Sequence, residues 1–167
     1  MIRYALAVIA LASAFAQPAL AQDGYPSKPI RLVVPFPPAG GTDVLSRAIS
    51  QSIIANTKWT ILVDNKPGAG GNIGLDATAK AAPDGYTIAM GQTANLAVNP
   101  ALYSSMPFDP LKDFAPIALI SSQPLILVVN ANSPYKTLKD LVDAAKASPG
   151  KINMASSSNG TIGHIGG

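Results

Sequence analysis

The sequence IRLVVPFPPAGGTD, from Ile30 to Asp43, determines how the rest of this chain is organised. Its first part, Ile30 to Val34, is a short apolar run rich in β-branched residues, which predicts a buried strand. Three of the next four residues are prolines, which cannot donate a hydrogen bond to a sheet ladder. The segment therefore predicts a strand that ends in a sharp turn.

The second part of the same segment has the composition of a helix start that could hold an anion. Gly40 and Gly41 permit a tight turn and let another group approach the backbone. Thr42 and Asp43 are good helix N-cap residues, and a helical pattern begins at Val44. A helix N-terminus offers unpaired N–H groups and a positive dipole end. The turn is therefore either an anion site or an ordinary capped connection.

Residues 1–21 have the pattern of a cleavable secretory signal peptide. Arg3 supplies a short positive region, Tyr4 to Ala16 is apolar, and the stretch that ends at Ala21 has the small-x-small pattern of a cleavage site. The apolar run is shorter than the roughly 20 residues of a membrane span. We expect export with cleavage after Ala21; an uncleaved membrane anchor is the alternative.

The composition excludes several classes of function. The chain has no Cys, so disulfides and thiolate chemistry are excluded. Without Arg3, 11 basic and nine acidic side chains remain, a net charge of +2 with no basic cluster, and we expect no nucleic-acid binding. One His and scattered Asp residues predict no metal site, and we expect no cofactor.

Strand and helix patterns alternate after the first turn, which predicts a parallel sheet covered by helices. Pro, Gly and Asn residues mark the turns between these elements. The predicted elements are a helix from Val44 to Ala55, a strand from Trp59 to Val63, a glycine-rich turn from Gly68 to Gly74, a helix from Leu75 to Ala81 and a strand from Tyr86 to Met90.

The stretch from Leu96 to Gln123 is interrupted repeatedly by proline, which indicates a connection between two lobes. Regular patterns then return. The sequence predicts a buried strand from Leu125 to Val129, a helix from Leu138 to Ala147 capped by Thr137, and a short strand from Lys151 to Ala155.

A second turn, from Ser156 to His164, repeats the composition of the first, with small hydroxyl residues and Gly between a predicted strand and a helix start. A serine near His164 could indicate an exported hydrolase, but the sequence shows neither an orienting acid nor a G-x-S-x-G turn. The glycine-rich turn also lacks a nucleotide fingerprint, because Ile73 stands where G-x-G-x-x-G needs its third Gly.

Six motifs together resemble those of the substrate-binding proteins of tripartite tricarboxylate transporters, the Bug family. The resemblance covers about residues 25–166. The motifs are YPSKPI from Tyr25, PFPPAGGTD from Pro35, NKPGAGGNIG from Asn65, APDGYT from Ala82, DPLKDFAP from Asp109, and the turn from Ser156 to His164.

The resemblance implies an α/β fold of the type II-like periplasmic binding protein class, with two lobes of parallel-rich sheets and covering helices around a cleft. Residues 22–100 would form the first lobe, residues 101–123 the crossing, and residues 124–167 the start of a truncated second lobe. It implies a monomeric periplasmic protein without enzymatic activity that delivers a small carboxylate to membrane transporter subunits.

The resemblance also implies that two turns grip the ligand from opposite lobes. Their donors would be backbone N–H and hydroxyl groups, since two helix N-termini can hold a carboxylate without an Arg partner. The implied ligand-binding residues are Gly40, Gly41, Thr42 and Asp43 in the first turn, Gln92 and Thr93 beside it, and Ser156, Ser157, Ser158 and Thr161 in the second turn.

Two departures from the family pattern bear on this interpretation. Ala39 stands where many members carry another Gly, and Ala does not readily adopt a positive φ. Members of the family are also about twice as long as this chain without its signal peptide, a length typical of two-lobed proteins. The serines near His164 leave an exported Ser/His hydrolase as one alternative. The short length leaves a truncated family fragment without function as the other.

Overall fold

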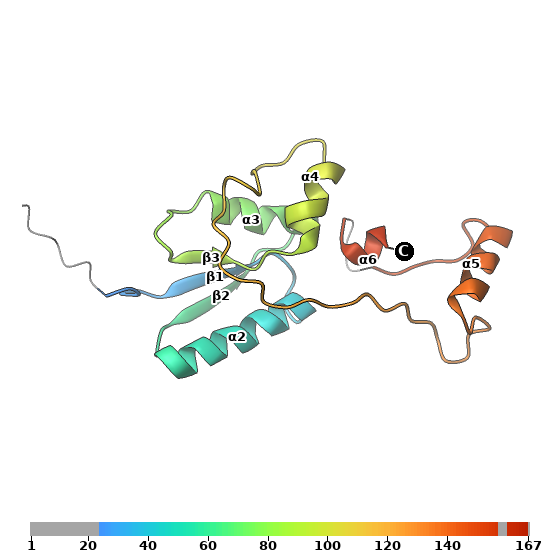
Figure 1. Ribbon diagram of the computed structural model, residues 1–167, viewed down its shortest axis with the longest axis horizontal. Helices are drawn as coiled ribbons and strands as arrows, with labels where there is room; N and C mark the ends of the chain where they lie inside the picture. Colours follow the sequence, from blue (N-terminus) through green and yellow to red (C-terminus); the bar gives the residue numbers. More distant parts are fainter. Residues whose placement is uncertain (1–23, 157–159, 167) are drawn as a thin grey trace, which may run out of the picture.

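A parallel sheet lies at the centre of the structure, a computed structural model that describes residues 24–156 and 160–166 (Figure 1). In these residues the sheet has three strands, in the order β2-β1-β3. Strand β1 therefore pairs with both neighbours. The strands are β1 (Ile30–Val34), β2 (Ile61–Asn65) and β3 (Thr87–Ala89).

Helices cover both faces of this sheet. Helix α2 (Gly41–Thr57) lies on one face, and helix α3 (Asn72–Ala79) lies on the other (Figure 1). Alternate residues of β1 are buried with Ile61, and Ile53 of α2 packs against this cluster. On α3, Leu75 is also buried. The apolar run from Ile30 to Val34 thus forms the middle strand of the sheet.

Several predicted elements are confirmed, with shifts at their ends. The strand from Ile30 to Val34 and the helix from Leu138 to Ala147, which is α5, have the predicted bounds. Strand β2 begins and ends two residues later than predicted. Helix α3 begins at Asn72 rather than Leu75, directly after a short 3-10 turn, η1 (Ala69–Gly71).

The predicted irregular region begins too early, because a helical segment occupies part of it. A π-type turn, η2 (Ala94–Val98), runs into helix α4 (Asn99–Leu102). The sequence misleads here because Asn99-Pro100 has the appearance of a helix break. Pro100 lies in the first turn of α4, where the missing N–H of proline is tolerated.

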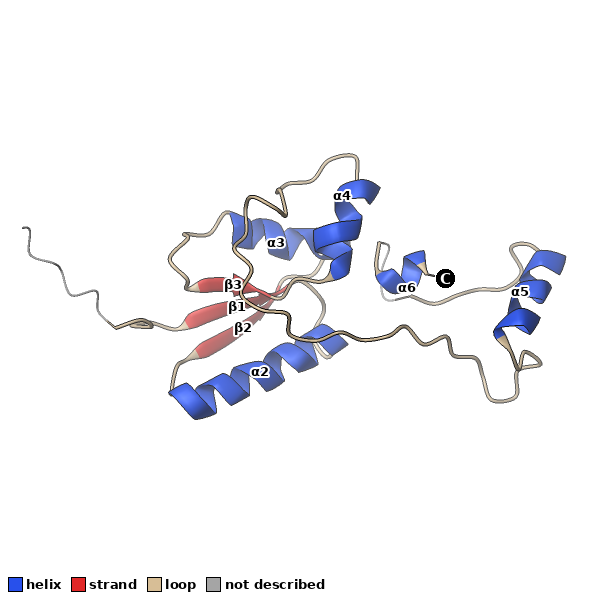
Figure 2. Ribbon diagram, in the orientation of Figure 1, coloured by secondary structure: helices blue, strands red, loops and turns tan. Residues whose placement is uncertain are grey.

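Two predicted strands are wrong. Residues 125–129 and 151–155 have no regular structure (Figure 2). A strand needs a neighbour for its backbone N–H and C=O groups, and no described segment pairs with either stretch. All five side chains from Leu125 to Val129 are exposed. The apolar, β-branched composition of this run predicts a buried strand, but the run is neither buried nor a strand.

Helix α5 and the short helix α6 (Ile162–Ile165) complete the described structure. The Thr137 side chain accepts a hydrogen bond from the N–H of Asp140, and the Asp140 carboxylate accepts one from the N–H of Thr137, a capping box. All residues of α5 are at least partly exposed. In the part of the chain that is described, no helix combines the length and apolar character of a membrane span.

Candidate functional site

The N-terminus of α2 follows β1 directly and carries no capping side chain from the described residues. Its N-cap is Gly40, so the predicted caps Thr42 and Asp43 lie inside the first turn, and the helix begins three residues before Val44. The first helical hydrogen bond runs from the N–H of Val44 to the oxygen of Gly40, at 3.0 Å. The N–H groups of Gly41, Thr42 and Asp43 therefore have no acceptor within the helix.

The two glycines at this helix end are not required by the backbone. Gly40 has a φ of −73°, which any residue adopts. A Cβ atom added to Gly40 would lie 3.5 Å from the Pro37 oxygen, an ordinary contact, and one added to Gly41 would meet nothing within 4 Å. The left-handed position of the turn is instead Ala39, with a φ of 66°. The glycines thus leave open space above the helix N-terminus.

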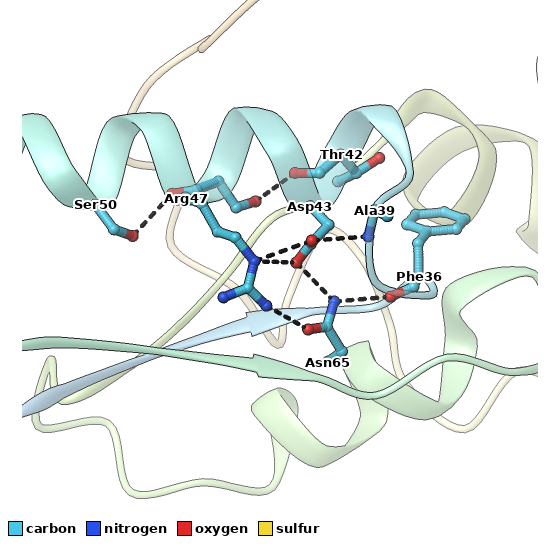
Figure 3. Close-up of polar contacts among 8 residues, drawn as sticks. Phe36, Ala39, Thr42, Asp43, Arg47, Ser50 and Asn65 are labelled. Carbon is cyan, nitrogen blue, oxygen red and sulfur yellow. Dashed lines mark hydrogen bonds and ion pairs between the residues drawn. The ribbon is translucent and has the colours of Figure 1, made fainter.

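Asp43 is buried beneath this turn and its carboxylate is fully engaged (Figure 3). It accepts hydrogen bonds from the Ala39 N–H at 2.9 Å, the Asn65 amide at 2.9 Å and Arg47 Nε at 3.0 Å. These donors, Arg47 first, lower the pKa of Asp43 to about 2. The Asn65 amide also donates to the Phe36 oxygen at 3.1 Å. The network ties the turn to the end of β2.

This network decides what Asp43 can contribute. Its oxygens point to Ala39, Arg47 and Asn65, so its side chain shapes the turn instead of meeting a ligand. Arg47 is about half exposed and balances the Asp43 charge. Because Arg47 neutralises the Asp43 carboxylate, the helix N-terminus keeps its positive character and can still hold an anion.

Gln92 joins the same helix end from 50 residues further along the chain. Its Nε2 donates a hydrogen bond to the Thr42 hydroxyl. The pairing of β3 with β1 brings it there, since the N–H of Met90 still donates to the Val33 oxygen at 2.9 Å. Thr93 is exposed and directly precedes η2. The structure thus brings the predicted residues Thr42 and Gln92 together at the carboxyl ends of the neighbouring strands β1 and β3.

The second turn lies against α4. Thr161 is buried and caps α6, where its hydroxyl accepts from the N–H of His164 at 3.3 Å. A Cβ on Gly160 would lie 2.7 Å from Asn99 Oδ1 and 3.0 Å from Leu102. Ser156 is exposed. The predicted residues Ser157 and Ser158 lie outside the described residues.

His164 has a local role in the second turn. Its Nδ1 accepts a hydrogen bond from the N–H of Gly160 at 3.3 Å. The ring therefore closes the turn in which it lies. No group of three or more metal-ligating side chains occurs in residues 24–156 and 160–166.

Sequence reasoning missed two residues beside the site, Asn95 and Asn99. Both are fully buried, and the Asn95 side chain accepts a hydrogen bond from the N–H of Gln92 at 2.9 Å. Their spacing of four residues would place them on one face of a helix. That signal is weak in the sequence because Asn99-Pro100 has the appearance of a helix break.

This arrangement can be compared with known proteins. Residues 45–167 match the model of a family described as the tripartite tricarboxylate transporter family receptor. The chain belongs to this family. The family that the sequence motifs indicate is thereby confirmed.

Curated relatives of this receptor chain include BugT of Bordetella pertussis, which is 40% identical over 144 residues, covering 86% of this chain and 44% of BugT. A UPF0065 protein from the tcbD-tcbE intergenic region of a Pseudomonas species is 41% identical over 143 residues, which cover 86% of this chain and 42% of that protein. The chain thus spans less than half the length of these relatives.

Solved structures of similar proteins agree with the fold. A Rhodopseudomonas palustris protein with adipate is 34% identical, with a TM-score of 0.71 over 75% of this chain and 42% of that one. MatC from the same organism, with bound malate, is 31% identical, with a TM-score of 0.69 over 74% and 42%. The periplasmic binding protein BugD is 33% identical, with a TM-score of 0.70 over 84% and 47%.

These relatives are solute-binding receptors and not enzymes. The expectation that this receptor chain is not an enzyme is therefore confirmed, and the Ser/His hydrolase is the weaker interpretation. The hydrogen bond between His164 and Gly160 agrees with this result, since it gives the only histidine of the sequence a structural role.

Proposed function

We propose that this chain is the ligand-gripping N-terminal part of a periplasmic receptor that binds a small carboxylate and delivers it to a membrane transporter. The observation that carries the proposal is the open N-terminus of α2, where Gln92 meets Thr42. Three N–H groups that have no acceptor within the helix, together with a positive dipole end, suit a carboxylate.

The proposed contacts divide into three groups. Gly41, Thr42 and Asp43 would donate backbone N–H groups, and Gly40 would leave room for the ligand. Gln92 and the exposed Thr93 would line one side of the site. The second turn, with Ser156, Ser157, Ser158 and Thr161, would close over the ligand from the other lobe. Closure follows when a ligand makes contacts that exist only in the closed state.

The related structures support the chemical class of the ligand. Two of them contain adipate and malate, which are both dicarboxylates. The related structures also include a periplasmic transporter and the periplasmic binding protein BugD, which supports the proposed location. Delivery to transporter subunits is the role that the family description suggests.

The test is a thermal melt of the purified chain with adipate, malate and the neutral analogue 1,6-hexanediol. A ligand that binds only the folded state at a hundred times its dissociation constant adds about 2.7 kcal/mol of stability. We expect the acids to raise the melting midpoint and the diol to leave it unchanged. Equal midpoints with and without the acids would refute carboxylate binding by this chain.

A pair of glutamine variants locates the site. Gln92→Ala removes the amide that meets Thr42, whereas Gln51→Ala removes an exposed amide further along α2. We expect the first to reduce the acid-induced shift and the second to preserve it. A full shift in Gln92→Ala would mean that the acids bind elsewhere.

A further inference from the structure

The segment formed by η2 and α4 carries two fully buried asparagines, Asn95 and Asn99, on one helical face. Asparagine is seldom fully buried, and a buried amide destabilises a fold unless its polar atoms are hydrogen-bonded. Each of these amides leaves one atom without a partner among the described residues, namely Asn95 Nδ2 and Asn99 Oδ1. Such atoms need a physical explanation.

Asn95 holds Gln92 in place. Its Oδ1 accepts a hydrogen bond from the N–H of Gln92 at 2.9 Å, while the Gln92 side chain reaches Thr42. Its amide lies tightly against the glycine-rich turn, since a Cβ on Gly71 would be 2.5 Å from Nδ2. Gly71 has a φ of 96°, so glycine suits this position for both conformation and space. Gln92 is therefore fixed through its main chain as well as its side chain.

Asn99 forms the surface on which the second turn rests. Its Nδ2 donates to the Gly70 oxygen at 3.2 Å and to Asn72 Oδ1 at 2.7 Å. Its Oδ1 faces the second turn, where a Cβ on Gly160 would lie only 2.7 Å away. The glycine-rich turn thus fixes Asn99 from one side, and Asn99 supports Gly160 on the other.

We propose that Asn95 and Asn99 are positioning residues that hold the two turns of the ligand site on one buried surface. Asn95 holds Gln92 by a hydrogen bond, and Asn99 supports Gly160 by close packing. Apolar side chains would fill the same space without unpartnered polar atoms, but they could neither accept from the Gln92 N–H nor donate to Gly70 and Asn72. The inference rests on the proposed function, because it takes both turns to be parts of a carboxylate site.

The test measures hydrogen exchange of single amides by NMR in the purified, isotope-labelled chain. Asn95→Ala should speed exchange at Gln92 about tenfold, the factor expected for one lost hydrogen bond, and leave Gly160 unchanged. Asn99→Ala should speed exchange at Gly160, because the turn that holds the Gly160–His164 hydrogen bond loses the side chain packed against it, and should leave Gln92 unchanged. The reference is the Arg31 amide in the central strand, which donates to the Tyr86 oxygen at 2.8 Å and should keep its rate. Asn56→Ala removes an exposed amide that donates to the Ser52 oxygen and should change none of these rates.

Two outcomes would overturn the proposal. One is unchanged exchange at Gln92 in Asn95→Ala and at Gly160 in Asn99→Ala. The other is an equal acceleration at Arg31, which would show a general loss of stability. Where an alanine variant does not fold, Asn95→Ser or Asn99→Ser serves in its place, with the same two criteria.

Ligand titration separates this proposal from the proposed function. In a chain that binds adipate, both variants should weaken its affinity about tenfold by calorimetry, and Asn56→Ala should not. A wild-type chain that binds neither adipate nor malate would refute the carboxylate function, while the exchange rates would still decide whether the asparagines hold the turns.

Discussion

Replacing Gly41 by alanine should stabilise the protein and weaken ligand binding at the same time. Gly41 is the first residue of α2, and a Cβ atom there would meet nothing within 4 Å. Alanine restricts the unfolded chain more than glycine and favours a helix, so we expect a gain of about 0.4–1 kcal/mol in the free energy of unfolding. For a chain of this size that gain corresponds to roughly 1–4 °C in the melting midpoint.

The loss of binding follows from the same open space. The added methyl group would occupy the region in front of the helix N–H groups, where we place the carboxylate. Urea unfolding and adipate titration of Gly41→Ala measure the two effects separately. A variant that is more stable and binds adipate as well as the wild type would refute the idea that the glycine leaves room for a ligand.

Gly74→Ala is the matched control for this substitution. Gly74 also lies in a helix, but a Cβ there would be 2.8 Å from Pro35 and 2.9 Å from the Lys66 oxygen. Overpacking of this kind destabilises by about 1–3 kcal/mol. A stabilised Gly74→Ala would show that the contact distances do not predict the effect of a methyl group in this chain.

Three further changes test other parts of the structure. Ala39→Gly should raise the free energy of unfolding by about 0.5–1 kcal/mol in urea, since Ala39 has a φ of 66°, and an equal or lower stability would contradict this. The pKa of Asp43 is lowered to about 2 by Arg47 and its other donors, so its contribution is present above about pH 4 and is lost as the pH falls towards 2. Asp43→Asn should therefore flatten the decline of stability between pH 4 and 2, and an unchanged slope would refute this role. Thr137→Ala should destabilise α5 by about 1 kcal/mol and reduce its helical NMR shifts, with no change in the unfolding midpoint of the sheet, because α5 has no buried residue.

The elements that the sequence predicts with correct bounds are those with strong local signals. The strand from Ile30 to Val34 is apolar, β-branched and closed by proline. Helix α5 has both partners of its capping box within four residues, Thr137 and Asp140. Local chemistry decides such elements, so they can be predicted without knowledge of the rest of the fold.

The errors arise where structure depends on distant partners. The run from Leu125 to Val129 has strand composition, but composition cannot supply a neighbouring strand. The sequence indicates too late a start for α2 because Thr42 and Asp43 are good caps, whereas the Asp43 carboxylate bonds to Arg47 and Asn65 instead. The Asn65 and Gln92 contacts likewise join residues that only the sheet order brings together.

The exposed apolar stretch has a consequence for the behaviour of this chain at high concentration. No charged residue occurs from Phe114 to Tyr135, and the side chains from Leu125 to Val129 face solvent. Segments of this composition stack between molecules into cross-β aggregates when nothing covers them. Pro116, Pro124 and Pro134 interrupt the stretch and limit stacking at those three points. The chain should therefore be more soluble when another polypeptide covers residues 125–129 than when these residues are left exposed.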